Sequence, residues 1–212
     1  MKIFIDSADV REIQKCFETK LISGVTTNPT LIGKSGRKPT DVYVELEQMG
    51  IRDISMEVTA SAWNDMYAEA MELVQLFESA TIKLPMTVEG LKVCRNLPET
   101  VRTNVTLIFN AAQALLEAAA GATYVSPFVG RIDDQGYAGL EVVRSIAELY
   151  SKQNLDTKVL AASIRTPQRV VRSFYNGADI VTMPPKVFWQ MYGHVLTDQG
   201  LQIFEKAYEV IG

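Results

Sequence analysis

The chain has 212 residues, of which 47% are hydrophobic and 22% charged, and its formal net charge is −4. This composition is typical of a soluble folded protein with a sizeable core, and no stretch reaches the roughly 18 apolar residues that a membrane span needs. The acidic balance disfavours nucleic acid or an anionic membrane as the main partner.

The first residues, Met-Lys-Ile-Phe-Ile-Asp, enter a strand pattern at once. They leave no room for a signal peptide, so we expect a cytoplasmic protein. Cys16 and Cys94 stand alone in helix-like segments without the spacing of a metal site, which predicts ordinary reduced thiols.

Short β-branched segments alternate with longer amphipathic ones along the chain, as in βα units around a parallel sheet. Strands are expected near residues 2–6, 23–27, 53–58, 80–84, 103–107, 122–126, 158–163 and 179–182. Helical spacing and end signals mark helices between Trp63 and Phe77, between Gly139 and Tyr150 with Asn154 closing it, and from about Asp198 to Val210.

Eight such units in this length predict an α/β fold. We expect one (β/α)8 TIM barrel domain over residues 1–212, with an additional C-terminal helix at about 198–211. A doubly wound open sheet is the alternative fold. Phe204, Tyr208 and Ile211 form an apolar stripe on the last helix that could pack on its own chain or on another.

Lys83 is a charged residue in the apolar segment Ala80–Pro85. Burying an unpaired ammonium costs several kcal/mol or forces the group to become neutral. A neutral amine can attack a carbonyl and form a Schiff base, which is the covalent route to aldol chemistry without a metal. The alternative is a lysine at a strand end whose ammonium reaches water past apolar neighbours.

In a barrel, active-site groups gather at the C-terminal ends of the strands. The polar residues expected there are Asp6, Thr26, Asn28, Glu57, Lys83, Asn104, Thr106, Ser126, Ser163 and Arg165. Because side chains alternate along a strand, Lys83 should point opposite to its apolar neighbours, and so should Asn104 and Thr106. The three side chains would then share the barrel interior.

Schiff-base chemistry needs an acid/base, for which Asp6 is the first candidate, while Glu57 and Thr106 could hold a relay water. Asp6 could instead cap a helix beginning near Ala8, a task for which Ser7 competes.

Asn28 and Asn104 could orient the hydroxyls of a polyol substrate, or serve only as turn and strand-end residues. Arg131 and Arg165, together with Ser126 and Ser163, would suit a sugar phosphate at the barrel mouth. The alternative for Arg131 is a surface ion pair with Asp133 or Asp134.

The only histidine, His194, argues against a zinc aldolase and against a Ser-His-Asp triad, and its simplest role is structural. Nucleotide-binding glycine loops are absent from the sequence. We therefore expect no cofactor and no metal.

Five segments together resemble the transaldolase family, in particular its small-subunit branch, which also holds fructose 6-phosphate aldolase. They are Gly24–Thr30, Thr81–Thr87, Asn104–Phe109, Ser126–Arg131 and Ala161–Arg165. The resemblance runs along nearly the whole chain in order, and five motifs in one register are far more specific than any one of them.

The resemblance implies a role for each candidate residue. Lys83 would form the Schiff base with the ketose, Asp6 would be the general acid/base, and Glu57 with Thr106 would position the catalytic water. The substrate would be bound by Thr26, Asn28, Asn104, Ser126 and Phe128, and its phosphate by Arg131, Ser163 and Arg165.

The reaction implied is transfer of a dihydroxyacetone unit from sedoheptulose 7-phosphate to glyceraldehyde 3-phosphate in the pentose phosphate pathway, giving erythrose 4-phosphate and fructose 6-phosphate. Fructose 6-phosphate aldolases of this branch carry tyrosine where this chain has Phe128, glutamine at Glu57, and lack the asparagine equivalent to Asn104. These differences favour transaldolase over the aldolase alternative.

The branch also implies a homo-oligomer, a pentamer or a decamer, in which the C-terminal helix packs on a neighbour. Two functions of other classes fit the same barrel. One is a phosphosugar isomerase that uses a carboxylate base without a covalent lysine. The other is a catalytically silent barrel that binds sugar phosphates.

Overall fold

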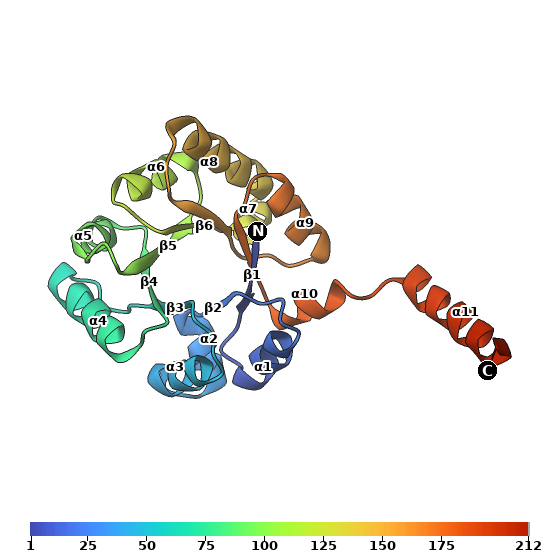
Figure 1. Cartoon of the computed structure of the whole chain (residues 1–212). Coiled ribbons are helices and arrows are strands. Elements are labelled where there is room, and N and C mark those ends of the chain that lie inside the picture. Colours follow the sequence, from blue (N-terminus) through green and yellow to red (C-terminus); the bar gives the residue numbers. More distant parts are fainter. Residues whose placement is uncertain (212) are drawn as a thin grey trace.

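The computed structural model describes the backbone of residues 1–211 and the side chains of residues 1–209. Eight parallel strands close into a barrel in the order β1 to β8, with β8 paired to β1 (Figure 1). They are β1 Lys2–Asp6, β2 Gly24–Thr26, β3 Ile54–Glu57, β4 Ala80–Pro85, β5 Arg102–Ile108, β6 Tyr124–Pro127, β7 Lys158–Ala161 and β8 Ile180–Met183. The predicted barrel is confirmed, and the open sheet is excluded.

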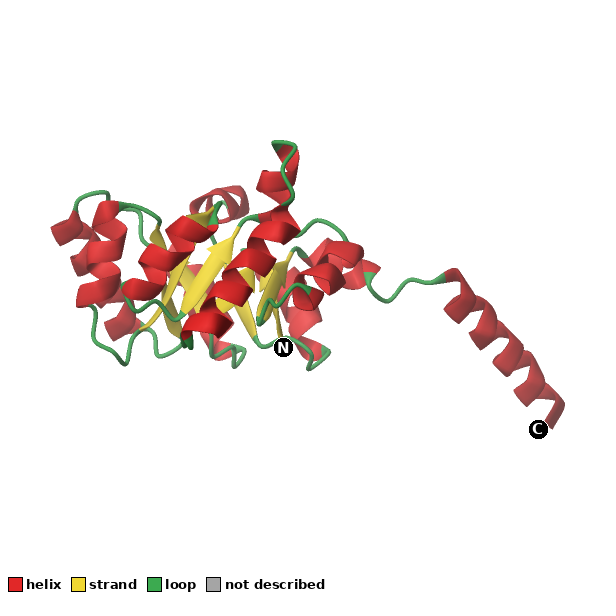
Figure 2. Ribbon diagram, turned by 90° about the horizontal axis from the view of Figure 1, so that it is seen from above, coloured by secondary structure: helices red, strands yellow, loops and turns green. Residues whose placement is uncertain are grey.

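Helices surround the strands on the outside of the barrel, except for the last one, α11 (Figures 1 and 2). They are α1 Val10–Glu18, α2 Pro29–Ser35, α3 Pro39–Gln48, α4 Trp63–Leu76, α5 Val88–Asn96, α6 Ala111–Ala119, α7 Val129–Asp134, α8 Gly139–Gln153, α9 Pro167–Tyr175, α10 Pro185–Gln190 and α11 Val195–Ile211. The predicted end of α8 is confirmed, because Asn154 closes that helix in the left-handed conformation. The last helix begins at Val195, earlier than expected.

Two layers of apolar side chains hold the barrel together. The larger lies between strands and helices and includes Ile82, Val105 and Val125, whereas Phe4, Tyr124, Leu160, Ala162 and Ile180 fill the barrel interior. Three of these interior residues, Phe4, Tyr124 and Ile180, stand two positions before a polar residue of the same strand. Alternation therefore carries these polar side chains to the mouth, above an apolar floor.

One buried carboxylate, that of Asp53, links strands at the floor of the barrel. Asp53 accepts hydrogen bonds from the hydroxyls of Thr81 and Tyr124, each at 2.7 Å. These bonds join the residue before β3 to β4 and β6, at the end of the barrel opposite the mouth.

The two cysteines and the histidine agree with their predicted structural roles. Cys16 and Cys94 are buried free thiols, and burial raises the pKa of each to about 11. His194 lies directly before α11, where its Nδ1 accepts a hydrogen bond from the backbone N–H of Leu196 at 3.2 Å.

Helix α11 stands clear of the barrel in both views, joined to α10 by a short connection (Figures 1 and 2). Its apolar side chains are exposed: Ile203 by 65%, Phe204 by 71% and Tyr208 by 80%. The side chain of Ile211, the third member of the predicted stripe, lies outside the described residues. No helix in residues 1–211 is both long and apolar enough to cross a membrane.

One buried carboxyl group belongs to no site. Glu117 on α6 is fully buried, and neither of its carboxyl oxygens has a hydrogen-bond partner among the described residues. Burial raises its pKa well above the ordinary value of 4.5. The folded protein therefore keeps the proton on this group at pH values where the unfolded chain has lost it.

This arrangement predicts that Glu117→Met stabilises the protein. Because the folded state holds the proton more tightly, the stability of the wild type should fall as pH rises above about 4.5, by up to about 1.4 kcal/mol per pH unit. Removing an unpartnered polar group adds about 1–3 kcal/mol. Urea unfolding between pH 5 and 8 should show a gap between variant and wild type that widens with pH. Glu117→Gln is the control, and a gap independent of pH in both variants would contradict the prediction.

Candidate active site

A small cavity of about 100 Å³ opens at the C-terminal ends of the strands. It is lined by Asp6, Thr26, Asn28, Lys83, Asn104, Thr106, Ser126, Phe128, Arg131, Leu160, Ala162, Ser163 and Thr182. Every predicted site residue lines this cavity except Glu57 and Arg165. We call it the mouth pocket.

Lys83 projects from β4 into the mouth pocket and is only 5% exposed. Its Nζ lies 2.8 Å from Oε2 of Glu57 and donates a hydrogen bond to the backbone carbonyl of Thr27, also at 2.8 Å. The predicted burial and inward orientation are confirmed. The amine is not unpaired, however, because the Glu57 carboxylate is its partner.

The barrel register explains this ion pair. Glu57 and Lys83 are direct partners across the β3–β4 ladder, so their side chains leave neighbouring strands at the same level on the same face. Glu57 also lines a second, outer cavity of about 710 Å³ with residues such as Pro29, Thr59 and Thr87. Its carboxylate therefore stands between the lysine amine and a space outside the mouth pocket.

Asp6 ends β1 on the other side of the mouth pocket. Burial raises the pKa of its carboxyl group, while the charge of Lys83 and a hydrogen bond from Thr26 oppose that rise. The hydroxyl of Thr26 donates to Oδ1 of Asp6 at 2.8 Å, and the hydroxyl of Thr182 lies 2.7 Å from that of Thr26. Asp6 does not cap α1, because the cap is Asp9, whose side chain accepts from two backbone N–H groups of the first turn.

A chain of polar side chains crosses β3, β5 and β6. Asn104 donates from Nδ2 to the hydroxyl of Ser55 at 3.0 Å and accepts at Oδ1 from the hydroxyl of Ser126 at 2.6 Å. Thr106 follows Asn104 two positions later on β5, and its hydroxyl is buried without a hydrogen-bond partner among the described residues. It is available to bind a water or a substrate oxygen in the mouth pocket.

The backbone of β5 changes course directly after Thr106. Leu107 has a φ of 64°, and the pairing of β5 with β6 shifts register between Val105 and Ile108. A left-handed leucine costs roughly 1–2 kcal/mol, so the surrounding barrel must enforce it. The irregularity marks the point at which the strand leaves the sheet beside the mouth pocket.

Asn28 has a structural role as well as a place in the mouth pocket. Its Oδ1 accepts from the backbone N–H of Leu31 at 3.0 Å and so caps α2, with Pro29 at the first helical position. The turn role weighed from the sequence is therefore real, and the amide nitrogen remains for the mouth pocket.

Positive charge gathers at the β6–β7 side. The guanidinium of Arg131 lies over the ring of Phe128, 4.9 Å from its centroid. The ion pair weighed for Arg131 is wrong: Asp134 pairs with Arg165, and Asp133 pairs with Arg169. Arg131 is thus left to line the mouth pocket, whereas Arg165 stands at its edge.

The family described as Transaldolase/Fructose-6-phosphate aldolase matches residues 3–211 of this chain. The chain belongs to that family. The five segments that suggested the resemblance all lie within the match.

Relatives in this family carry consistent names. Proteins of Clostridium kluyveri and Brachyspira hyodysenteriae, each named probable transaldolase, are both 48% identical to this chain, with 100% of it and 99% of each relative covered. A probable transaldolase of Clostridium botulinum is 49% identical, with 99% of this chain and 97% of the relative covered.

Solved structures support the fold alone. Inosine 5′-monophosphate dehydrogenase of Legionella pneumophila aligns with a TM-score of 0.62 at 12% identity, covering 88% of this chain and 58% of that one. Thiamine phosphate pyrophosphorylase of Pyrococcus furiosus aligns with a TM-score of 0.59 at 13% identity, covering 86% and 85%.

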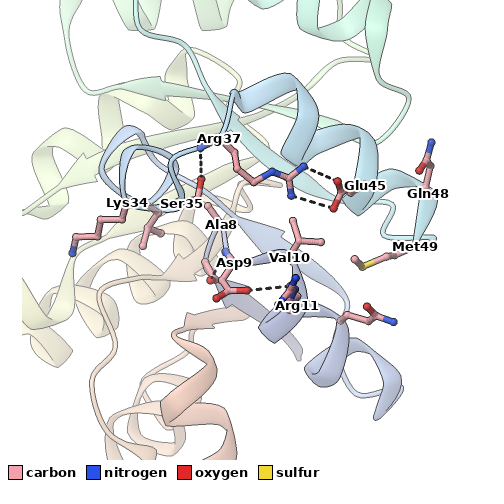
Figure 3. A pocket seen from close by; sticks show the side chains of 13 residues that line it. Ala8, Asp9, Val10, Arg11, Lys34, Ser35, Arg37, Glu45, Gln48 and Met49 are labelled. Atoms are coloured by element: carbon pink, nitrogen blue, oxygen red, sulfur yellow. Dashed lines mark hydrogen bonds and ion pairs between the residues drawn. The ribbon is translucent and has the colours of Figure 1, made fainter.

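This family member also has a hollow that is larger than the mouth pocket. A hollow of about 970 Å³ lies on the outer wall beside α1, α2 and α3, and Figure 3 shows its lining. Arg37 and Glu45 pair across it with two hydrogen bonds, and Asp9 is occupied as the cap of α1. Arg37 and Glu45 therefore satisfy each other, and none of the predicted site residues lies there.

Proposed function

We propose that this protein is a transaldolase that transfers a dihydroxyacetone unit between sugar phosphates through a Schiff base on Lys83. One observation carries the proposal: Lys83 projects into a barrel-mouth pocket that also contains the carboxyl group of Asp6. The names of its relatives support the same function. Residues 1–212 would act as one catalytic domain.

The chemistry follows from the contacts of Lys83. Transfer of a proton from Nζ to the Glu57 carboxylate, 2.8 Å away, yields the free amine. The amine attacks the ketose C2 carbonyl to form a carbinolamine. The proton held by Glu57 then passes to the carbinolamine oxygen, which leaves as water and gives the protonated imine. Glu57 and the unpartnered hydroxyl of Thr106 are suited to hold that water.

Asp6 would then serve as the acid/base for the carbon–carbon bond. Its carboxylate accepts the proton of the C4 hydroxyl while the C3–C4 bond breaks, and the electron pair of that bond passes into the protonated imine to form an enamine. The aldehyde product leaves, an acceptor aldehyde enters, and the same steps reverse with Asp6 returning the proton to the new alkoxide. The small volume of the mouth pocket suits a three-carbon unit, and the phosphate end would extend toward Arg131, Ser163 and Arg165.

The test is a trapping experiment. Incubation with fructose 6-phosphate and sodium borohydride should leave a stable adduct that peptide mass mapping assigns to Lys83, and transfer products should appear in parallel assays. A phosphosugar isomerase would interconvert sugars without an adduct. A silent barrel would be stabilised by the sugar phosphate without turnover. Either result would overturn the proposal.

Phe128 provides a test against the aldolase alternative. Phe128→Tyr would place a phenol in the mouth pocket that can protonate the enamine, releasing free dihydroxyacetone. We expect cleavage to rise relative to transfer by up to about 10²-fold in steady-state assays of both products. Phe109→Tyr is the matched control, because this ring packs against Phe128 at 6.0 Å without lining the mouth pocket. An unchanged ratio in Phe128→Tyr would count against this role of the apolar ring.

We further propose that the protein acts in the cytoplasm, in the pentose phosphate pathway, as a homo-oligomer in which α11 packs on another copy. The exposed apolar side chains of α11 support this assembly. A chain ending at His194 should then have the mass of a monomer in light scattering, while the full chain has that of a pentamer or decamer. Equal masses for the two chains would refute the role of α11.

A further inference from the structure

Arg165 and Asp134 form a two-pronged ion pair at the edge of the mouth pocket. Nη2 of Arg165 donates to Oδ2 of Asp134 at 2.5 Å, and Nη1 donates to Oδ1. Asp134 is the last residue of α7, and Arg165 lies in the connection between β7 and α9. Although the pair is about half exposed, two parallel hydrogen bonds give it a fixed geometry that ordinary surface pairs lack.

The pair leaves the Nε edge of the guanidinium free, and Nε lies near Gly130 and Ser163. A Cβ added to Gly130 would lie 2.9 Å from Nε of Arg165 and 2.9 Å from the hydroxyl oxygen of Ser163. Ser163 and Arg131, the residue that follows this glycine, both line the mouth pocket. Asp134 occupies the terminal nitrogens from outside, and within residues 1–211 no acceptor is bonded to Nε.

We infer that Asp134 is a positioning residue, which holds Arg165 so that its Nε edge is presented to the phosphate of the substrate. The inference rests on the proposed function for the identity of the substrate. A free arginine side chain has considerable rotamer entropy, part of which is lost when it binds an anion. Asp134 removes that freedom before the ligand arrives, so the loss no longer weakens binding.

Electrostatic repulsion alone predicts that Asp134 weakens phosphate binding, which is the opposite of the positioning effect. A carboxylate near a phosphate repels it, so removing the negative charge should tighten phosphate binding. If positioning dominates, the same removal weakens binding, because Arg165 is released from its place. The sign of the change in affinity therefore separates the two effects.

Asp133 offers a matched control on the same helix. It pairs with Arg169 at 3.1 Å and accepts from the backbone N–H of Gly139 at 3.0 Å. Asp133→Asn removes one negative charge from the adjoining residue of α7 but leaves the Arg165 pair in place. Its effect on affinity measures the contribution of charge alone.

The experiment measures calorimetric binding of glucitol 6-phosphate, which has no carbonyl group and cannot form a Schiff base. Asp134→Asn should raise Kd by about tenfold, whereas Asp133→Asn should leave it unchanged or lower it, and Asp134→Glu should recover part of the loss. Adding Asp134→Asn to Arg165→Lys should cause no further loss, because the residue acts through Arg165. An unchanged or lower Kd in Asp134→Asn overturns the inference.

A second readout separates positioning from damage to the site. Borohydride trapping with unphosphorylated dihydroxyacetone should proceed equally in wild type, Asp133→Asn and Asp134→Asn, while the KM for glyceraldehyde 3-phosphate rises in Asp134→Asn alone. Weaker trapping in Asp134→Asn would indicate a structural defect and overturn the inference. If the wild type forms no adduct, the proposed function fails, and the calorimetric comparison still decides the role of Asp134.

Discussion

Lys83→Arg is expected to reduce transfer activity by on the order of 10⁴-fold or more, because arginine keeps the positive charge but cannot form an imine. The guanidinium can still pair with Glu57, so the buried carboxylate is not left alone. Rates of transfer from fructose 6-phosphate to an aldehyde acceptor measure the loss, and borohydride should trap nothing on this variant.

The choice of arginine matters for the control. Lys83→Met would leave Glu57 without its partner, and breaking a buried pair costs about 3–5 kcal/mol. We therefore expect Lys83→Met to be less stable than Lys83→Arg, and Lys83→Met combined with Glu57→Gln to recover part of that loss. Thermal unfolding of the three variants separates lost chemistry from lost folding. Residual activity above about a tenth of wild type in Lys83→Arg would exclude a covalent lysine mechanism.

Asp6→Asn is expected to lower kcat by about 10²- to 10⁴-fold, since the amide cannot accept or return the C4 hydroxyl proton. Lys83 keeps its contacts with Glu57 and Thr27, so the borohydride adduct should still form, although more slowly. Single-turnover measurements can separate imine formation from carbon–carbon cleavage. Loss of the adduct together with activity would contradict the separate role of Asp6.

The pH dependence of kcat gives an independent measurement of the pKa of Asp6. Burial raises the pKa of Asp6, while the hydrogen bond from Thr26 favours the carboxylate and lowers it. Thr26→Val removes that bond, so the pKa should rise further and the limb of the profile that follows Asp6 should move to higher pH. A limb that moves to lower pH, or that persists unchanged in Asp6→Asn, would belong to another residue.

Much of the barrel could be predicted because its local patterns agree with its tertiary structure. All eight strands lie within about two residues of the expected ranges. Alternation was enough to place Lys83, Asn104 and Thr106 together, because a polar residue in an apolar strand can avoid the core only by facing the mouth.

Other features of the site have no sequence signal. The backbone carbonyl of Thr27 accepts the hydrogen bond from Lys83. Because every residue has a backbone carbonyl, the sequence does not indicate which one will accept this bond. The left-handed Leu107 and the partner of Arg165 likewise depend on how distant segments meet. Charge pairing of Lys83 with Glu57 could have been anticipated from their matching places at the ends of adjacent strands.

Thr182 is a site residue that sequence reasoning missed although a signal was present. It is a polar residue near the end of the eighth expected strand, at a position equivalent to the other candidates, and its hydroxyl supports Thr26 in the structure. The expectation that polar residues at strand ends belong to the active site was applied to the other seven strands. Applied to the eighth strand, it would have identified Thr182.

The buried thiols of Cys16 and Cys94 make the native chain suitable for site-specific labelling. With a pKa of about 11, each thiol is ionised in only about one molecule in 10⁴ at pH 7, and the surrounding core blocks reagents as well. A maleimide dye would therefore react with a single cysteine introduced on the surface, for example at Gln202, without removal of either native cysteine. Fluorescence energy transfer between dyes on separate chains could then test whether the chain forms the proposed homo-oligomer.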